Sequence, residues 1–410
     1  MRRDSARRVA LLTYHACPLA APGRGKAGGM NVHVRELARA MAAQGATVDI
    51  FTRQHEDQES DAPAIADNVN VVHLPAGPPN ALLAQQFEHL DEFVAGVLEH
   101  QRGEDAQYRA VHSHYWMSAW AGRRLAAAIG VPHVVTFHTL SRIKMQSRSG
   151  EWEPPVRQES ECQIIADADC IVAFSAHERD AMVRLYDGDP SRIHLVPCGV
   201  DLARFRPLGR AEARNELGLN GHKVLLYVGR IEALKGVDLL IHTATHLPTE
   251  NVQVLVVGAD ADGSGEIARL KQMAEELNVS EAFEFVGRVP QEQLAWYYSA
   301  ADVCVVPSFY ESFGLAALES MACGTPVVAS RVGGLSTVVQ HGRTGYLKSW
   351  RCPEAFANSL EMILVNDSLR DSMGRAGRRR AEGLSWEEVA GRLFDIYEGL
   401  TPGTGGRAEA

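Results

Sequence analysis

Two carboxylates flank a Phe-Gly step in the run Glu311-Ser-Phe-Gly-Leu-Ala-Ala-Leu-Glu319. Gly314 would let backbone amides approach a ligand closely. The run after it predicts a helix whose N-terminus faces the same spot. One acid is then expected at the mouth of an anion site, and the other about two turns into the helix. This arrangement suits a ligand with a phosphate and several hydroxyls, although a surface helix with two exposed acids is the simpler interpretation of this run alone.

A pair of cations lies in Val228-Gly-Arg230-Ile-Glu-Ala-Leu-Lys235-Gly. This segment is expected to be a strand-to-helix loop, on which Arg230 and Lys235 can converge on one diphosphate. The arginine would offer a fork of donors and the lysine a point charge. A solvated basic loop is the alternative, but the two carboxylates predicted at the same sheet edge favour binding.

Paired glycines precede the first predicted helix, in Gly28-Gly29-Met-Asn31. They allow a tight turn and expose N–H groups at a helix N-terminus, which is a natural cradle for a diphosphate. The motif differs from the dinucleotide GxGxxG, and it is no Walker loop because no G-K-[ST] follows. Alone, it is more simply interpreted as a plain turn.

Histidines end two strands of the first half, in His112-Ser-His114-Tyr-Trp and in Phe137-His138-Thr-Leu. Two histidines at this spacing could ligate a metal. We interpret strand alternation as pointing them to opposite faces, so no metal site is predicted. His138 could donate a hydrogen bond to a sugar hydroxyl or act as an electrophile, whereas a core histidine is the default for this residue alone.

The stretch that follows His138 is basic and lacks regular periodicity. It carries Arg142, Lys144, Arg148 and Arg157. As a mobile loop it could hold an anionic acceptor, and a solvated surface loop is an equally good interpretation.

Composition bounds the class of protein. The 410 residues are too many for one core, which predicts two domains. A net charge of −10 and a pI near 5.9 argue against a nucleic-acid partner. No apolar run reaches the ~18 residues of a membrane span, so no transmembrane segment is expected. Seven scattered cysteines without a CxxC pair predict a reducing, cytoplasmic location and no zinc site.

Short apolar runs alternate with helical patterns in two series. The predicted strands of the first series are Val9–Tyr14, Thr47–Thr52, Val71–Leu74, Ala110–Ser113, His133–Phe137 and Cys170–Phe174. Those of the second are Lys223–Val228, Val252–Val257, Phe283–Val286, Val303–Val306 and Pro326–Ala329. Strands that alternate with helices predict an α/β protein with two doubly wound parallel sheets and ligands at the carboxyl ends of the strands. The join is expected in Pro197–Pro207, where two prolines and a glycine occur.

Taken in order, these motifs resemble the family-4 retaining glycosyltransferases, which have the two-domain GT-B fold. Pro197-Cys-Gly-Val-Asp201 and Gly287-Arg288-Val289 belong to the matching set. The resemblance implies two Rossmann-like domains that face each other across a cleft. Residues 1–199 would form the acceptor domain, onto which a helix at about 384–400 packs back. Residues 200–383 would bind the nucleotide sugar, and residues 401–410 would be a flexible tail.

The resemblance also implies roles on the donor side. Arg230 and Lys235 would bind the diphosphate and stabilise the leaving group. Glu311 would contact the transferred sugar, and His138 would do so near the reacting carbon. The remaining donor-binding positions would be Gly28, Gly29, Arg288, Val289, Phe313, Gly314, Leu315 and Glu319, with Glu319 on the ribose and Arg288 and Val289 beside the base.

The acceptor side resembles the glycosyltransferases of mycothiol biosynthesis, which transfer N-acetylglucosamine from UDP to inositol phosphate, and also sucrose-phosphate synthases. The candidate acceptor residues are Asn31, Tyr115, Thr139, Lys144 and Arg157. One departure is that residues 73–86 contain no lysine or arginine. Phosphate-binding members tend to place a basic residue there, so a neutral polyol, a thiol-bearing metabolite or a natural-product acceptor stays open.

The expected reaction is a front-face transfer of GlcNAc or glucose that retains configuration. A UDP-sugar donor is favoured, and GDP or ADP stays open. No cofactor is expected for the chemistry. Binding of Mg²⁺ stays open, although the sequence shows no evident site for it. The partners would be the nucleotide sugar and a small polar acceptor, and a homodimer stays open. A sugar-nucleotide epimerase or phosphorylase and a catalytically silent subunit are the competing hypotheses.

Overall fold

The computed structural model describes residues 7–20, 28–55, 64–219, 221–260, 265–349 and 351–400, and strands alternate with helices through these ranges. These residues form two units. Unit 1 contains residues 7–20, 28–199 and 386–400, and unit 2 contains residues 200–385. The division after residue 199 falls within the segment Pro197–Pro207. The predicted flexible tail, 401–410, lies outside the described residues.

Unit 1 is built on one parallel sheet, seven-stranded in the described residues, in the order β3-β2-β1-β4-β5-β6-β7. Its strands are β1 (Arg8–Leu12), β2 (Thr47–Arg53), β3 (Val69–Leu74), β4 (Val111–His114), β5 (His133–Thr136), β6 (Cys170–Ala173) and β7 (Ile193–Leu195). The central strands are buried along nearly their whole length, as expected for a sheet covered on both faces.

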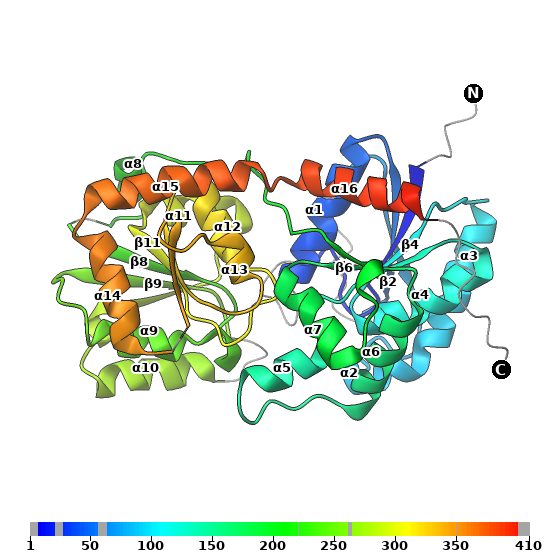
Figure 1. Ribbon diagram of the computed structural model, residues 1–410, viewed down its shortest axis with the longest axis horizontal. Helices are drawn as coiled ribbons and strands as arrows, with labels where there is room; N and C mark the ends of the chain where they lie inside the picture. Colours follow the sequence, from blue (N-terminus) through cyan, green and yellow to red (C-terminus); the bar gives the residue numbers. More distant parts are fainter. Residues whose placement is uncertain are drawn as a thin grey trace. The chain divides into compact units, whose positions relative to one another are not determined.

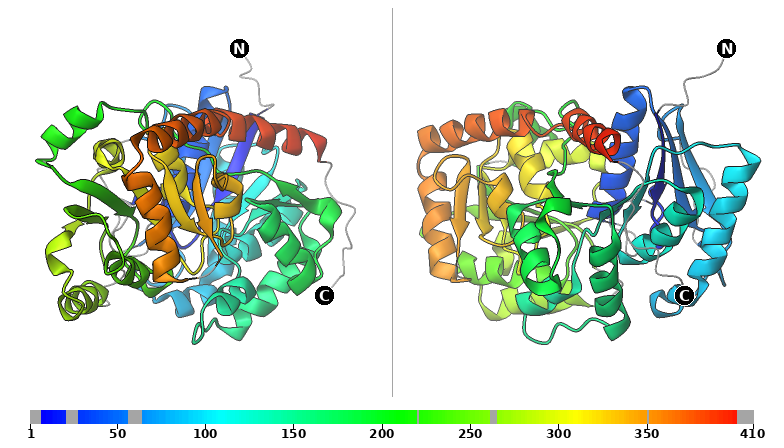
Figure 2. Two further views of the ribbon diagram at one scale, coloured as in Figure 1. Left: turned by 60° about the vertical axis from the view of Figure 1, so that its left-hand side comes forward. Right: turned by 45° about the vertical axis from the view of Figure 1, so that its right-hand side comes forward.

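The helices of unit 1 pack on this sheet and on one another (Figures 1 and 2). They are α1 (Gly29–Ala43), α2 (Leu83–Gln86), α3 (Leu90–Gly103), α4 (Trp116–Ile129), α5 (Ser141–Ser147), α6 (Pro155–Asp167), α7 (Ala176–Tyr186) and α16 (Trp386–Gly399). Helices α3, α4, α6 and α7 pack each against the next. The last helix, α16, lies beside α1, and Gln44 Nε2 donates to the Glu387 carbonyl at 2.8 Å. The end of the chain therefore completes the first unit.

Unit 2 repeats the architecture with a second parallel sheet, six-stranded over the described ranges, in the order β10-β9-β8-β11-β12-β13. Its strands are β8 (Lys223–Val228), β9 (Val252–Val257), β10 (Phe283–Gly287), β11 (Val303–Val306), β12 (Val327–Ser330) and β13 (Gly345–Lys348). Its helices are α8 (Arg210–Glu216), α9 (Val237–Ala244), α10 (Glu266–Glu276), α11 (Leu294–Ala300), α12 (Leu315–Ala322), α13 (Leu335–Val338), α14 (Pro353–Leu364) and α15 (Asp367–Glu382). Helix α14 packs on α9, and α12 packs on α15. The prediction of two parallel-sheet, Rossmann-like domains is confirmed.

Strand order decides where each unit can bind a ligand. In unit 1 the order reverses between β1 and β4, and in unit 2 between β8 and β11. At such a point the loops that leave neighbouring strands turn to opposite faces, which opens a crevice at the carboxyl ends. Glycine motifs follow β1 and β8, so both motifs belong to these reversal points.

Two edge strands were missed from sequence. β7 is only three residues long, and two of them are exposed, so it lacks the apolar run that marks a buried strand. β13 begins at Gly345, where φ is +154° and an added Cβ would lie 1.9 Å from the Val327 carbonyl oxygen. Only the neighbouring strand makes this segment extended, so its own residues gave no signal.

No helix within the described ranges is both long and apolar enough to cross a membrane.

The strand ends of unit 2 depend on a close backbone contact that only glycine permits. Gly258 follows β9 with φ +151°, and an added Cβ would lie 1.8 Å from the Gly229 carbonyl oxygen. We expect Gly258→Ala to lower the free energy of unfolding by roughly 2–4 kcal/mol. Gly287→Ala is the matched control, because φ is also positive there (+83°) but nothing lies within 4 Å of the new Cβ. Its cost should be roughly 1 kcal/mol. Urea unfolding would measure both, and equal losses would contradict the packing argument.

Candidate active site

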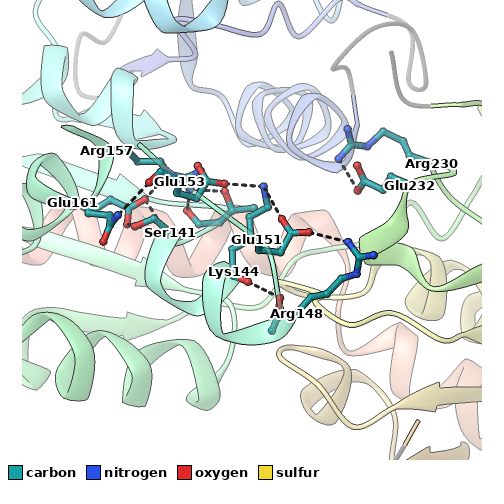
Figure 3. A network of polar contacts seen from close by, with 12 residues as sticks. Ser141, Lys144, Arg148, Glu151, Glu153, Arg157, Glu161, Arg230 and Glu232 are labelled. Carbon is teal, nitrogen blue, oxygen red and sulfur yellow. Dashed lines mark hydrogen bonds and ion pairs between the residues drawn. The ribbon is translucent and has the colours of Figure 1, made fainter. Parts of the chain in front are cut away.

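The loop that carries Arg230 and Lys235 starts where β8 ends. Gly229 adopts φ +158°, and the Tyr227 hydroxyl donates to the Arg230 carbonyl at 2.7 Å, which fixes the turn. The Arg230 guanidinium pairs with Glu232 Oε1 at 3.1 Å, as Figure 3 shows. Both side chains are partly exposed, so this pair can exchange Glu232 for another anion at little cost.

The structure brings Lys235 and Glu311 together. Lys235 Nζ lies 2.7 Å from Glu311 Oε2, and both side chains keep some exposure to solvent. The Phe309 N–H donates to the Leu234 carbonyl at 2.8 Å and ties the two loops to each other. A cation and an acid that are 76 positions apart therefore form one polar site in unit 2.

Glu319 is buried on α12 and has a phenol as its partner. It is 8% exposed, and the Tyr298 hydroxyl donates to its Oε2 at 2.8 Å. Burial raises the pKa of Tyr298 well above its ordinary value, and the Glu319 carboxylate raises it further. Glu319 lies just over one turn into the helix rather than the expected two, because α12 begins only at Leu315.

The turn before α12 is built by glycines on two loops. Gly314 is the N-cap with φ +102°, after the buried Phe313 and before Leu315, the first helical residue. A second pair, Gly333 and Gly334, was missed from sequence. An added Cβ on Gly333 would lie 1.9 Å from the Glu311 carbonyl oxygen, to which the Gly334 N–H donates at 3.0 Å. Paired glycines after the strand β12 were the available signal.

Arg288 and Val289 follow directly after β10, which is an edge strand of the unit 2 sheet. Arg288 is exposed and Val289 is half-buried. Their role beside a base stays a prediction.

The Gly28-Gly29 motif forms the start of α1 in unit 1. Gly28 is the N-cap, Gly29 is the first helical residue, and Gly28 is extended at φ −161°. The buried Asn31 accepts from the Gly28 N–H at 3.0 Å and donates to the Cys17 carbonyl at 2.7 Å. Asn31 therefore holds the helix start against the loop after β1. Residues 21–27, which lead into the motif, lie outside the described residues.

The histidines that end β4 and β5 gather in one buried cluster. His138 has φ +61°, and its Nε2 lies 2.9 Å from Nδ1 of His114. The rings of His112 and His114 stack with centroids 4.4 Å apart, so the expectation that they point to opposite faces is wrong. Residues two apart in a strand share a face, because the side-chain period is two.

His33 on α1 joins this cluster and was missed from sequence. Within the described part of the chain, His33, His114 and His138 are a group that could hold a metal ion, with ligand atoms within 4.8 Å of one another. His33 Nδ1 lies 3.3 Å from Cys198 Sγ. Burial lowers the pKa of His33 to about 3, so its imidazole is neutral at pH 7. The helical position of His33 alone could not reveal contacts with two distant strands. The absence of a metal in the reaction stays a prediction.

Four predicted acceptor residues form a second cluster in unit 1, and Figure 3 shows two of them, Lys144 and Arg157, with their carboxylate partners. The Arg157 guanidinium lies 5.0 Å from the centre of the Tyr115 ring and donates to the Thr139 hydroxyl and carbonyl, each at 2.9 Å. Lys144 and Arg157 share Glu153, at 2.7 and 2.9 Å. The structure therefore joins Tyr115, Thr139, Lys144 and Arg157, while Asn31 belongs to the start of α1.

Carboxylates balance the cations of this cluster, and they were missed from sequence. Arg157 is buried and also binds Glu161 at 2.7 Å. Burial alone would lower the pKa of Arg157, but Tyr115, Glu161 and Glu153 outweigh it and raise that pKa. Burial likewise opposes ionisation of Glu153, but Arg157 and Lys144 hold its pKa below the ordinary value. Glu153, Arg157 and Glu161 are spaced by four residues, which was the usable signal.

Residues 73–86 contain no lysine or arginine, but the side chain of Arg53 on β2 contacts this segment. Arg53 is 0% exposed, and it donates from Nε to the Ala76 carbonyl at 2.7 Å and from its other nitrogens to the carbonyls of Pro78 and Pro79. Its donors are used on the backbone of this segment, so Arg53 supports the segment from within.

The two units, with cations and acids at the strand ends of unit 2 and histidines at those of unit 1, have the architecture of a GT-B glycosyltransferase. Residues 28–199 match the family described as Glycosyl transferase 4-like domain, and residues 209–380 match Glycosyl transferases group 1. The chain is 41% identical to a D-inositol 3-phosphate glycosyltransferase of Rhodococcus jostii, over 98% of this chain and 91% of the relative. It is 40% identical to one of Xylanimonas cellulosilytica, over 96% and 97%. The chain belongs to the glycosyltransferase family that these two domain models describe, as the motifs predicted.

Solved structures agree with this assignment. Sucrose-phosphate synthase from Thermosynechococcus elongatus has a TM-score of 0.88 and 35% identity, over 96% of this chain and 98% of that one. Anabaena HepE in complex with UDP-glucose has a TM-score of 0.76 at 18% identity, over 96% of this chain and 100% of that one, and shows the fold alone.

Burial of neutral histidines makes unit 1 sensitive to acid. The ring of His133 on β5 lies 2.9 Å from the Ser113 hydroxyl, and burial, assisted by Arg123, lowers its pKa to about 3. The unfolded chain, with a pKa near 6.5, binds more protons between these values, so stability falls as the pH drops below 6.5.

We expect His133→Asn to remove this contribution. Between pH 7.5 and 5.5 the wild type should lose about 1.4 kcal/mol more of its unfolding free energy than the variant. Comparison of the two proteins cancels the opposite effect of the buried Glu178, whose pKa burial raises to about 7. Urea unfolding at both pH values is the measurement, and the same pH dependence in both proteins would refute the argument.

Proposed function

We propose that this glycosyltransferase moves a hexosyl group, GlcNAc or glucose, from a UDP-sugar to a small polar acceptor such as inositol phosphate, with retention of configuration. The contact between Lys235 and Glu311 carries the proposal. A lysine held by an exchangeable carboxylate beside a diphosphate loop can move to the donor. Glu311 is then left to accept from sugar hydroxyls.

On the donor side, the chain offers two cations for the diphosphate and a buried acid for the ribose. Arg230 and Lys235 would neutralise the charge that develops on the leaving diphosphate. Glu319, whose Oε2 accepts from the Tyr298 hydroxyl, would accept from the ribose hydroxyls. Anabaena HepE shares the fold and was solved with UDP and with UDP-glucose, so a UDP-sugar is the first donor to test.

The transfer is proposed as a front-face displacement. The acceptor oxygen bonds to the anomeric carbon while the bond from that carbon to the diphosphate breaks. The acceptor proton passes to the departing diphosphate oxygen. His138 would contact the donor sugar near the reacting carbon. Water exclusion by closure around the substrates would strengthen each of these charge interactions.

The acceptor is proposed to bind at Tyr115, Thr139, Lys144 and Arg157. Relatives named D-inositol 3-phosphate glycosyltransferase support inositol phosphate, and the sucrose-phosphate synthase structure supports a sugar phosphate as the alternative. The carboxylates around Lys144 and Arg157 favour a third candidate, a polyol without phosphate, since they already neutralise both cations. A cytoplasmic location is part of the proposal, supported by seven free cysteines.

Nucleotide-dependent stabilisation tests the donor assignment. UDP-GlcNAc or UDP-glucose should raise the melting temperature, because a ligand that binds only the folded state stabilises it. Glu319→Ala should lose most of this shift, whereas Glu284→Ala, an exposed acid on β10, should keep it. Thermal unfolding with UDP, GDP and ADP sugars, with and without Mg²⁺, is the measurement. No shift with any of them would refute the donor site, and sugar analysis after incubation with donor alone would reveal an epimerase.

The charge on Lys235 should matter most in the transition state. Lys235→Ala is expected to lower kcat by roughly a hundredfold, because it removes one charge-assisted contact to the leaving group. Transfer to inositol phosphate, fructose 6-phosphate and myo-inositol would be assayed with a UDP-sugar donor. Lys271→Ala is the control, since this lysine lies over the Phe285 ring in the same unit. Full turnover by Lys235→Ala would reject the assigned role.

A further inference from the structure

The ring of His138 is held by neighbours from three elements of unit 1. His114, the last residue of β4, meets its Nε2 at 2.9 Å. His33 on α1 packs edge-on with ring centroids 5.0 Å apart, and Phe174 after β6 lies at 5.3 Å. With φ at +61°, the His138 backbone is also confined to a conformation that few residues other than glycine adopt. The side chain is therefore held in one position, with its Nε2 facing His114.

His112 cannot replace His114 in this contact. Its Nδ1 lies 2.6 Å from the Tyr397 hydroxyl, and its Nε2 lies 2.8 Å from the Thr136 hydroxyl. Both ring nitrogens of His112 are thus used elsewhere. Its ring supports the His114 ring only by stacking.

The contact between His114 and His138 requires one shared proton. Both side chains are buried, and burial disfavours the charged imidazolium, so both imidazoles are neutral. A neutral ring carries one N–H and one acceptor nitrogen. Either His114 Nδ1 donates to His138 Nε2, or the reverse holds.

The far nitrogen of His114 decides between the two arrangements. Its Nε2 is buried and has no hydrogen-bond partner within the part of the chain that the structure describes. If His138 were the donor, His114 would carry its own proton on Nε2, as a buried N–H without an acceptor. Such orphaned donors are rare and costly. If His114 donates from Nδ1, only a lone pair is left at that position.

We propose that His114 is a positioning residue that sets the tautomer of His138, so that His138 accepts at Nε2 and carries its proton on Nδ1. Its Nδ1–H is then the donor that His138 directs to a substrate oxygen. This inference rests on the proposed function only for that last step. The hydrogen bond that one ring nitrogen makes fixes the role of the other.

Nitrogen NMR of the full-length protein tests the tautomer without any assay of activity. Histidine is labelled with ¹⁵N, His138 is assigned by the loss of its signals in His138→Gln, and long-range ¹H–¹⁵N correlations show which nitrogen is protonated. We expect Nδ1–H and a bare Nε2 at His138 in the wild type. The opposite tautomer there would overturn the proposal. The tautomer is observed in the wild-type protein, and His138→Gln serves only to assign the signals.

The variants test what the tautomer does. In His114→Phe, which keeps a ring but no donor, His138 should change its tautomer. kcat should fall by about tenfold to a hundredfold, while the affinity for the UDP-sugar stays the same. In His114→Asn, whose amide can donate from near the Nδ1 position, the wild-type tautomer and most of kcat should return. His133→Asn is the matched control, since His133 is an equally buried histidine on the same sheet that contacts Ser113 instead.

An unchanged His138 tautomer and an unchanged kcat in a folded His114→Phe protein would overturn the inference. Stoichiometric zinc in the purified protein that is lost in His33→Phe would also overturn it, since a metal on the three histidines would replace the shared proton. If no UDP-sugar is used as a donor, the proposed function fails by itself, and the NMR result still decides the tautomer.

Discussion

A charged group that is buried must be paired with an opposite charge or become neutral, and this constraint organises both units. In unit 1 the buried histidines are neutral, whereas the buried Arg157 is kept charged by Glu153 and Glu161. In unit 2 the partly exposed Lys235 has a carboxylate partner. The two solutions serve different chemistry, since neutral rings offer directed hydrogen bonds and exchangeable ion pairs offer charge to an incoming anion.

Parallel strand order places these groups. Each sheet reverses its order beside its first strand, so that loops from distant parts of the sequence meet at one edge. The edge of unit 2 needs glycine wherever two backbones touch, as at Gly258 against Gly229 and at Gly333 against Glu311. Side chains there would push the loops apart and move Glu311 away from Lys235. The glycines are thus part of the candidate site although they carry no functional group.

The proposed acceptor residues are where family membership says least about function. The cluster around Arg157 keeps the cations expected for a phosphate, but it supplies their counter-charges from its own helix and loop. Residues 73–86, where the resemblance led us to expect a cation, are instead held from inside by Arg53. A ligand phosphate would have to compete with two carboxylates, Glu153 and Glu161, whereas a neutral hydroxyl would not.

Local patterns were enough to predict the fold class, most strands and the family, because apolar runs and glycine motifs are properties of neighbouring residues. They also brought Glu311, Glu319, Arg230 and Lys235 to one domain. Local patterns could not predict contacts between distant segments of the chain. His112 and His114 were predicted to point to opposite faces through a misapplied strand period, but their rings stack. His33, Glu153 and Glu161 were not foreseen as partners. Which nitrogen of His138 is occupied, and which charges near Lys144 are already balanced, depends on side chains that meet only after the sheets assemble, since pairing and burial are set by three-dimensional neighbours.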